Sequence, residues 1–201
     1  FRNRSLSTFD SIAVDDALSH PTWRMGKKIS IDSATMANKA LEVIEASYLF
    51  GFQGDEIEVV IHPQSIIHSM IRTRDGAIYA QLGNPDMSLP IINALTSMSS
   101  DLVKPLNFNH LSLTFEEIDY ARFPLLRCGY DALSRQGGYP LAFNAANEVA
   151  VEAFLSERIT YPKLIDIVQR TLDHDWTFTP TTVEEIIALD RDVRLASKEL
   201  M

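Results

Sequence analysis

The sequence predicts an α/β domain over residues 1–98, in which helices surround an α+β-like mixed sheet, followed by an all-α four-helix bundle over residues 123–201. Three observations predict this fold class. Strand-like runs alternate with helical patterns up to residue 98, and only helical patterns follow residue 122. Hydrophobic residues make up 46% and charged residues 22%, the balance of a folded globular chain. Residues 99–122 contain Pro105 and little periodicity, so we expect a linker there.

Residues 15–50 are predicted to contain a few short elements and one long helix. We expect a short helix over 15–19, a loop over 20–28 and a short strand over 29–33. A helix is predicted over 35–50, with Gly51 just past its end, where a C-cap glycine belongs. Its expected buried positions recur at helical spacing: Met36, Ala40, Leu41, Ile44, Tyr48 and Leu49.

Strand signals follow this helix. Residues 56–62 are rich in Ile and Val and are predicted to form a buried strand. Residues 65–72 and 77–82 flank Asp75-Gly76, a pair typical of hairpin turns, so they are predicted to form an antiparallel hairpin. A helix is expected over 90–97.

Four helices are predicted in the C-terminal part. The first two cover 123–134 and 141–156. Thr160 is a suitable N-cap for the third, with Pro162 in its first turn. Thr182 and Glu185 have the spacing of a capping box at the start of the fourth. The fourth helix is expected to bury Val183, Ile186, Ile187, Val193, Ala196 and Leu200.

Composition argues against several classes of protein. The net charge of −9 does not favour a duplex nucleic-acid binder, which normally carries a basic face. The single cysteine, Cys128, allows neither an intrachain disulfide nor a cysteine-based zinc site. No apolar run is long enough to predict a transmembrane helix. The first residue is Phe1 and no signal-peptide core follows it, so we expect the chain to begin inside a longer protein.

The most informative stretch is residues 31–45, IDSATMANKALEVIE. Ser33, Asn38 and Lys39 fall just before or within the first turn of the helix predicted over 35–50, where backbone N–H groups and the helix dipole attract anions. Glu42 shares a face with Asn38 and Lys39 and offers a carboxylate to a hard metal ion. The alternative is structural: Thr35 is an N-cap, Lys39 and Glu42 form a surface pair, and Asn38 is solvated.

Three other features are candidates for chemistry. His20 lies beside Trp23 in the loop 20–28 and is suited to a lid that moves over a ligand. His62 and His68 flank the junction of two predicted strands, although single histidines are more often packed or solvated. Met87, after a predicted turn, fits either against a flat ligand or in a core. No HExxH, GxGxxG or GxxxxGK[ST] motif occurs.

Four motifs carry a family resemblance. HPTWRMGKKISIDSATMANKALEVIEA, IHPQSIIHSMI, QLGNPDM and LAFNAANEVAVEAFL occur in this order. Together they resemble the 1-deoxy-D-xylulose 5-phosphate reductoisomerase family over essentially the whole chain. The resemblance implies an NADPH-dependent oxidoreductase and isomerase of the non-mevalonate isoprenoid pathway, which uses Mg²⁺, Mn²⁺ or Co²⁺ to convert that phosphorylated ketose to 2-C-methyl-D-erythritol 4-phosphate. It implies that residues 1–98 are a catalytic and dimerisation domain.

The resemblance also implies residue roles. Ser33, Asn38 and Lys39, with His20, would hold the substrate phosphate, and Glu42 would bind both metal and substrate. Trp23 would cover the substrate, and Gly26, Met25 and Met87 would contact NADPH. His68 would support catalysis together with His20 and Glu42.

The family's NADPH domain and its Asp-Ser-Glu metal motif have no counterpart in this sequence. We therefore expect this chain to supply half of a site and to be inactive alone. The other hypothesis is a non-catalytic module for dimerisation or anion binding. A homodimer without nucleic-acid or membrane partners is expected, in the bacterial cytoplasm rather than the plastid stroma.

Overall fold

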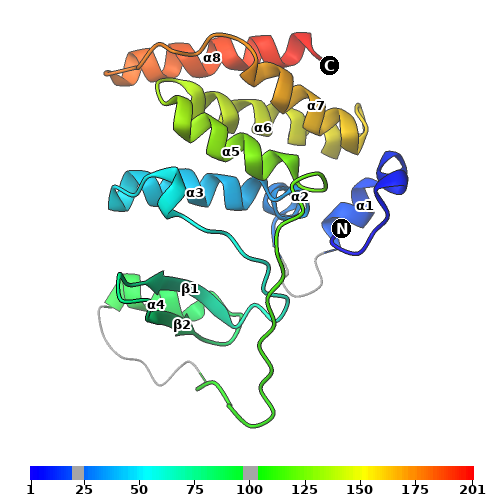
Figure 1. Ribbon diagram of the computed structural model, residues 1–201. Helices are drawn as coiled ribbons and strands as arrows, with labels where there is room; N and C mark the ends of the chain where they lie inside the picture. Colours follow the sequence, from blue (N-terminus) through cyan, green and yellow to red (C-terminus); the bar gives the residue numbers. More distant parts are fainter. Residues whose placement is uncertain (20–24, 97–103) are drawn as a thin grey trace. The chain divides into compact units, whose positions relative to one another are not determined.

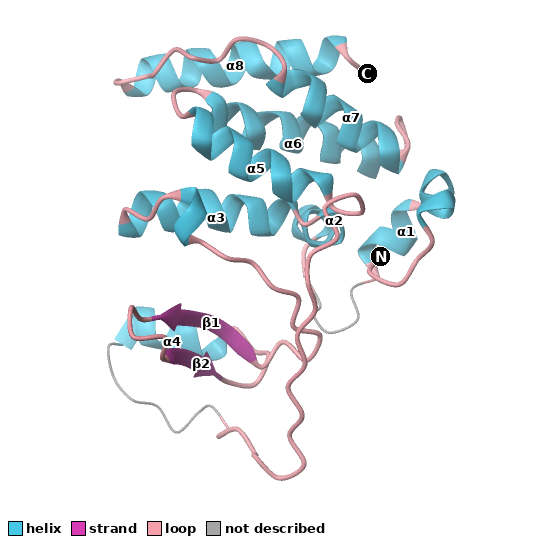
Figure 2. Ribbon diagram, viewed as in Figure 1, coloured by secondary structure: helices cyan, strands magenta, loops and turns pink. Residues whose placement is uncertain are grey.

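The computed structural model describes residues 1–19, 25–96 and 104–201. It is mostly helical with a small two-stranded antiparallel sheet (Figures 1 and 2). The chain divides into two compact units, Phe1–Val59 with Asp119–Met201, and Val60–Ile118. This confirms the predicted fold in its coarse form. The predicted domain limits at residues 98 and 123, and a separate four-helix bundle, stay predictions.

The first unit consists of helical layers. Its elements are the 3₁₀ helices η1 (Leu6–Ser11) and η2 (Gly54–Glu56) and the α-helices α1 (Val14–Leu18), α2 (Lys27–Thr35), α3 (Ala37–Phe50), α5 (Pro124–Arg135), α6 (Tyr139–Leu155), α7 (Tyr161–Leu172) and α8 (Val183–Glu199). Figure 1 shows α2 and α3 on one side of α5, α6 and α7, with α8 on the other side. Helix α6 packs against α2, α3, α5, α7 and α8. It is the most buried of the described helices, because apolar and small residues line most of its surface and only a narrow stripe with Glu148 and Glu152 reaches solvent.

The C-terminal helices begin where the sequence predicts. The Thr160 side chain accepts a hydrogen bond from the Lys163 N–H at the start of α7. At α8 the Thr182 hydroxyl accepts from the Glu185 N–H, and the Glu185 carboxylate accepts from the Thr182 N–H, which confirms the capping box. The predicted stripe of α8 is partly wrong, because Val183, Ile186 and Ile187 are exposed while Leu189, Val193 and Ser197 are buried.

Two predicted strands are wrong. Residues 29–33 lie inside α2, although their alternation of apolar and polar residues is typical of a strand. Ser30 and Asp32 are polar but buried, and hydrogen bonds satisfy both side chains. The polar positions of this run therefore do not mark an exposed face. The strand predicted over 56–62 does not form: Glu56 belongs to η2, and the run makes one isolated bridge, between Ile61 and Glu116, because no described segment pairs with the rest of it.

Helix α3 packs closely on α5 because Gly129 has no side chain. A Cβ at Gly129 would lie 2.5 Å from the Cβ of Ala40 and 2.9 Å from its Cα, both on α3. The Gly129→Ala variant is therefore expected to unfold at lower urea concentration, with a loss of about 1–3 kcal/mol for overpacking. Gly54→Ala is the matched control, since its Cβ would meet only side-chain atoms at an ordinary 3.7 Å. Equal stability of the two variants would contradict this packing.

The second unit contains the predicted hairpin and helix. Strands β1 (Ile67–Arg72) and β2 (Ile78–Leu82) pair antiparallel, and α4 (Ser88–Thr96) follows. Gly76 takes a φ of 88° in the turn. Hydrogen bonds from the Thr73 hydroxyl and the Ala77 N–H hold the pKa of Asp75 below its ordinary value. The turn is stabilised locally, which is why the sequence predicted it.

None of the helices in the described ranges has the length and apolar character needed to cross a membrane.

Candidate functional site

The residues singled out in 31–45 form a corner between two helices. Helix α2 ends at Thr35, Met36 takes a left-handed conformation with φ 60°, and α3 starts at Ala37. The buried Thr35 hydroxyl donates to the Ile31 carbonyl at 3.0 Å and accepts from the Ala37 N–H at 3.3 Å. This arrangement corrects two predictions. The N-cap of α3 is Met36 rather than Thr35, and α3 begins at Ala37, two residues after the predicted start.

The buried face of α3 differs in part from the predicted one. Ala37, Ala40, Val43 and Ile44 are buried. Tyr48 and Leu49 were expected in the core and are exposed. Gly51 ends α3 at φ 74°, as the sequence predicts. The core contacts therefore fix the first two turns of α3, which are the turns that carry Asn38, Lys39 and Glu42.

Asn38, Lys39 and Glu42 lie together on α3, as their spacing predicts. The Asn38 Nδ2 donates to one carboxylate oxygen of Glu42 at 2.6 Å, and the Lys39 Nζ lies 2.5 Å from the other. The side chains of Lys39 and Glu42 are 47% and 46% exposed. Such exposed pairs contribute little to stability, so packing does not require this constellation.

The corner is suited to an anion beside a carboxylate. Asn38 and Lys39 occupy the first turn of α3, where N–H groups lack intrahelical partners and the helix dipole is positive. Ser33, in the last turn of α2, is half-buried on the other side of Met36. An ammonium, an amide and backbone N–H groups are the donors that bind phosphate.

The described residues do not by themselves complete a metal site. Glu42 offers one exposed carboxylate, which is a hard ligand suited to Mg²⁺ or Mn²⁺. Within residues 1–19, 25–96 and 104–201, no group of three or more His, Cys, Asp or Glu residues is placed to hold a metal ion. Glu42 therefore fits a metal as one ligand of a set that these residues do not complete.

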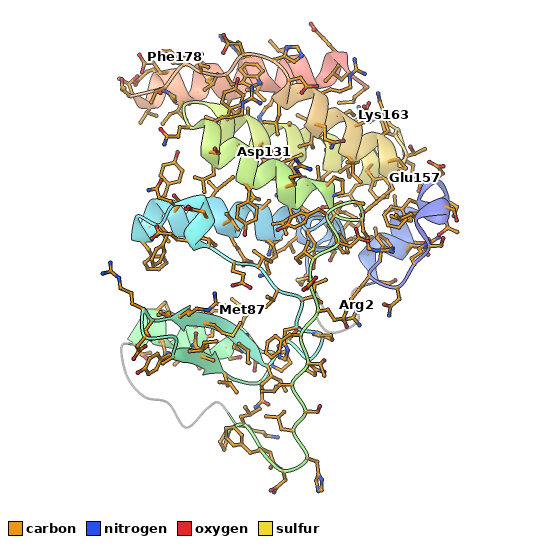
Figure 3. All side chains as sticks on the ribbon, viewed as in Figure 1. Arg2, Met87, Asp131, Glu157, Lys163 and Phe178 are labelled. Atoms are coloured by element: carbon orange, nitrogen blue, oxygen red, sulfur yellow. The ribbon has the colours of Figure 1, made fainter. Side chains whose placement is uncertain are left out.

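The remaining predicted site residues divide between the two units. Gly26 is the exposed N-cap of α2, and Met25 beside it is half-buried. His20 and Trp23 lie outside the described residues. In the second unit, His68 is exposed on β1, and a Cβ on Gly83 would lie 3.3 Å from its Nε2. Met87, just before α4, is exposed (Figure 3).

His62 is packed by its neighbours, and its Nε2 is buried without a hydrogen-bond partner among the described residues. Its Nδ1 lies 2.9 Å from the Thr114 carbonyl, and its ring stacks on Phe115. Cys128 is buried, and burial raises the pKa of its thiol to about 11, so it is unsuited to nucleophilic chemistry.

Sequence reasoning missed a buried polar network behind the corner. The Asp32 carboxylate of α2 lies 2.5 Å from the Lys28 Nζ and accepts from the Asn147 Nδ2 of α6 at 2.8 Å. The Tyr161 hydroxyl of α7 donates to the Ala34 carbonyl at 3.0 Å. The signal available in the sequence was an aspartate and an asparagine inside runs that are otherwise suited to burial.

Comparisons with known proteins match these elements. A family model described as the DXP reductoisomerase C-terminal domain matches residues 82–196, and a second, described as the 1-deoxy-D-xylulose 5-phosphate reductoisomerase C-terminal domain, matches residues 1–50. The 1-deoxy-D-xylulose 5-phosphate reductoisomerases of Treponema denticola and Chlorobium phaeovibrioides are 48% and 49% identical, each over 96% of this chain. The match covers 52% and 51% of those proteins, so the chain spans about half their length.

Solved structures agree with the sequence comparison. The Zymomonas mobilis reductoisomerase in complex with NADPH superposes with a TM-score of 0.91 at 40% identity, over 99% of this chain and 52% of that one. A DOX-P reductoisomerase in complex with NADPH, fosmidomycin and magnesium gives 0.89 at 38% identity, over 98% and 52%.

Proposed function

Because this chain belongs to the 1-deoxy-D-xylulose 5-phosphate reductoisomerase family, we propose that the protein containing it converts 1-deoxy-D-xylulose 5-phosphate to 2-C-methyl-D-erythritol 4-phosphate. NADPH and Mg²⁺, Mn²⁺ or Co²⁺ would be required. The observation that carries the proposal is the grouping of Asn38, Lys39 and Glu42 on one exposed face at the α2–α3 corner. Solved relatives in complex with NADPH and magnesium support the cofactors.

The corner anchors the phosphate end of the substrate. Ser33, Asn38 and Lys39 donate to the phosphate oxygens, and His20 completes this set. Lys39 pairs with Glu42 in the structure, so it exchanges the carboxylate for the phosphate on binding. This anchor breaks no bond; its binding energy orients the distant reacting carbons.

Glu42 has a different role at the same corner. Once Lys39 has turned to the phosphate, the Glu42 carboxylate is available as one metal ligand and as a contact with substrate. A divalent ion held there would supply positive charge that stabilises developing oxygen anions. Trp23 and His20 cover the substrate and exclude water. NADPH would supply the hydride. We assign contacts with NADPH to Gly26 and Met25 in the first unit and, separately, to Met87 in the second, and a supporting role to His68.

A homodimer is part of this proposal. Met70, Ile71, Ile78 and Tyr79 of the hairpin are exposed apolar side chains, which are typical of an interaction surface. The cytoplasmic location stays a prediction.

Activity of the isolated chain distinguishes the enzyme fragment from the non-catalytic module. The purified 201-residue chain is expected to show no NADPH oxidation with 1-deoxy-D-xylulose 5-phosphate and Mn²⁺, since its described residues place no group of three or more His, Cys, Asp or Glu side chains to hold a metal ion. The full-length protein is expected to turn over under the same conditions. Turnover by the isolated chain would contradict the half-site, and no turnover by the full-length protein would favour the module.

A further inference from the structure

A buried charge ties α2 to the C-terminal helices. The Asp32 side chain is 2% exposed, and Lys28, one turn earlier, reaches it from the rim of the unit with a 41% exposed side chain. A buried carboxylate requires a charge partner and hydrogen bonds to offset the loss of water. The Asn147 amide of α6, 115 residues away in sequence, provides one of these hydrogen bonds.

The Asn147 amide uses one of its two polar ends. The residue is fully buried in the centre of the most buried helix. Its Nδ2 donates to Asp32, but its Oδ1 accepts no hydrogen bond from any residue within the described ranges. An unpaired buried oxygen is destabilising, and an apolar side chain of similar volume avoids that cost. The specific contribution of Asn147 is therefore its bond to Asp32.

Tyr161 makes a second tie to the same helix. Its ring is buried and packs edge-on against Phe1, Phe9 and Phe154. Its hydroxyl donates to the carbonyl of Ala34, in the last turn of α2, where carbonyls lack intrahelical partners. Burial raises the pKa of Tyr161, so the hydroxyl stays protonated and able to donate.

The two ties hold the residues on either side of Ser33. Asp32 is fixed by Asn147 and Ala34 by Tyr161, and the left-handed Met36 then sets the direction in which α3 carries Asn38 and Lys39. We propose that Asn147 and Tyr161 are positioning residues of the phosphate anchor, through which the C-terminal helices set substrate affinity. This inference rests on the proposed function of the corner.

The test uses Tyr161→Phe and Asn147→Leu in the full-length protein. Tyr161→Phe keeps the ring and removes one hydroxyl, and Asn147→Leu keeps the volume and removes the amide. For each we expect the KM for 1-deoxy-D-xylulose 5-phosphate, and the competitive inhibition constant of inorganic phosphate, to rise about three- to tenfold, as for the loss of one hydrogen bond that orders the site. The KM for NADPH should not change, which a general structural defect would not predict.

Two control variants remove comparable buried contacts elsewhere. Tyr139→Phe loses a hydroxyl bonded to the His174 carbonyl, and Thr171→Val loses a contact with Ser197; neither bond involves α2. If Tyr161→Phe folds, and its KM for substrate and inhibition constant of phosphate match those of the controls, the positioning role is wrong. If Asn147→Leu does not fold, the result for Tyr161→Phe decides alone.

Lys39→Ala separates this inference from the proposed function. If Lys39→Ala weakens phosphate inhibition but Tyr161→Phe does not, the positioning inference fails and the phosphate anchor stands. If neither responds, the phosphate anchor itself is wrong and both proposals fall.

Discussion

Glu42→Gln in the full-length protein is expected to lower kcat by orders of magnitude. Glutamine keeps the shape and most of the hydrogen bonding but removes the charge that attracts a divalent cation, and the metal acts on the transition state. Stability without metal should change by under about 0.5 kcal/mol, because the carboxylate is half-exposed and its neighbours Lys39 and Asn38 are at the surface. Stabilisation by Mn²⁺ should shrink, since binding to the folded state produces it.

The measurement is paired: steady-state kinetics against Mn²⁺ concentration, and thermal melts with and without Mn²⁺. Asp166→Asn is the matched control, because Asp166 pairs with Lys163 over the same three-residue spacing in the first turns of α7 (Lys163 is labelled in Figure 3). The control should keep the kcat and Mn²⁺ dependence of the wild type. If Glu42→Gln does so too, Glu42 is not a metal ligand.

Lys39→Ala is expected to act mainly on KM. Loss of one charge-assisted contact with the phosphate costs about 1.5–3 kcal/mol, which corresponds to roughly ten- to a hundredfold in affinity. Ser33→Ala should have a smaller effect in the same direction, since it removes a neutral donor. Initial rates against substrate concentration measure both.

Lys163→Ala controls for the loss of a helix-surface lysine, because its Nζ lies 2.8 Å from Asp166 over the same spacing. The variant should leave KM unchanged. Kinetics of Lys39→Ala identical to those of Lys163→Ala would support the structural alternative, in which Lys39 and Glu42 are only a surface pair.

The elements that the sequence predicted are those specified by neighbouring residues. Thr160 and Thr182 cap helices through residues three positions away, and Gly51 ends α3 through its own backbone. Asp75 and Gly76 form a hairpin turn within five residues. Asn38, Lys39 and Glu42 lie within five residues on one face of α3, so their grouping also followed from spacing.

The wrong elements depended on distant residues. The strand predicted over 56–62 needs a partner, and in the described parts of the chain only Ile61 finds one, Glu116. Residues 29–33 form a helix in which the polar Asp32 is buried, and the partner that makes this possible is the Asn147 amide, 115 positions later in the sequence. Residue roles required the family resemblance, since spacing alone left Lys39 and Glu42 open between an anion site and a surface pair.

The most direct test of the phosphate–metal corner is an anomalous difference map of the full-length protein crystallised with 1-deoxy-D-xylulose 5-phosphate and Mn²⁺. The result we predict is a manganese peak on the Glu42 carboxylate, with the substrate phosphate within hydrogen-bonding distance of Ser33, Asn38 and Lys39. A substrate phosphate bound elsewhere, with Lys39 still paired to Glu42 and no manganese beside it, would contradict the proposal.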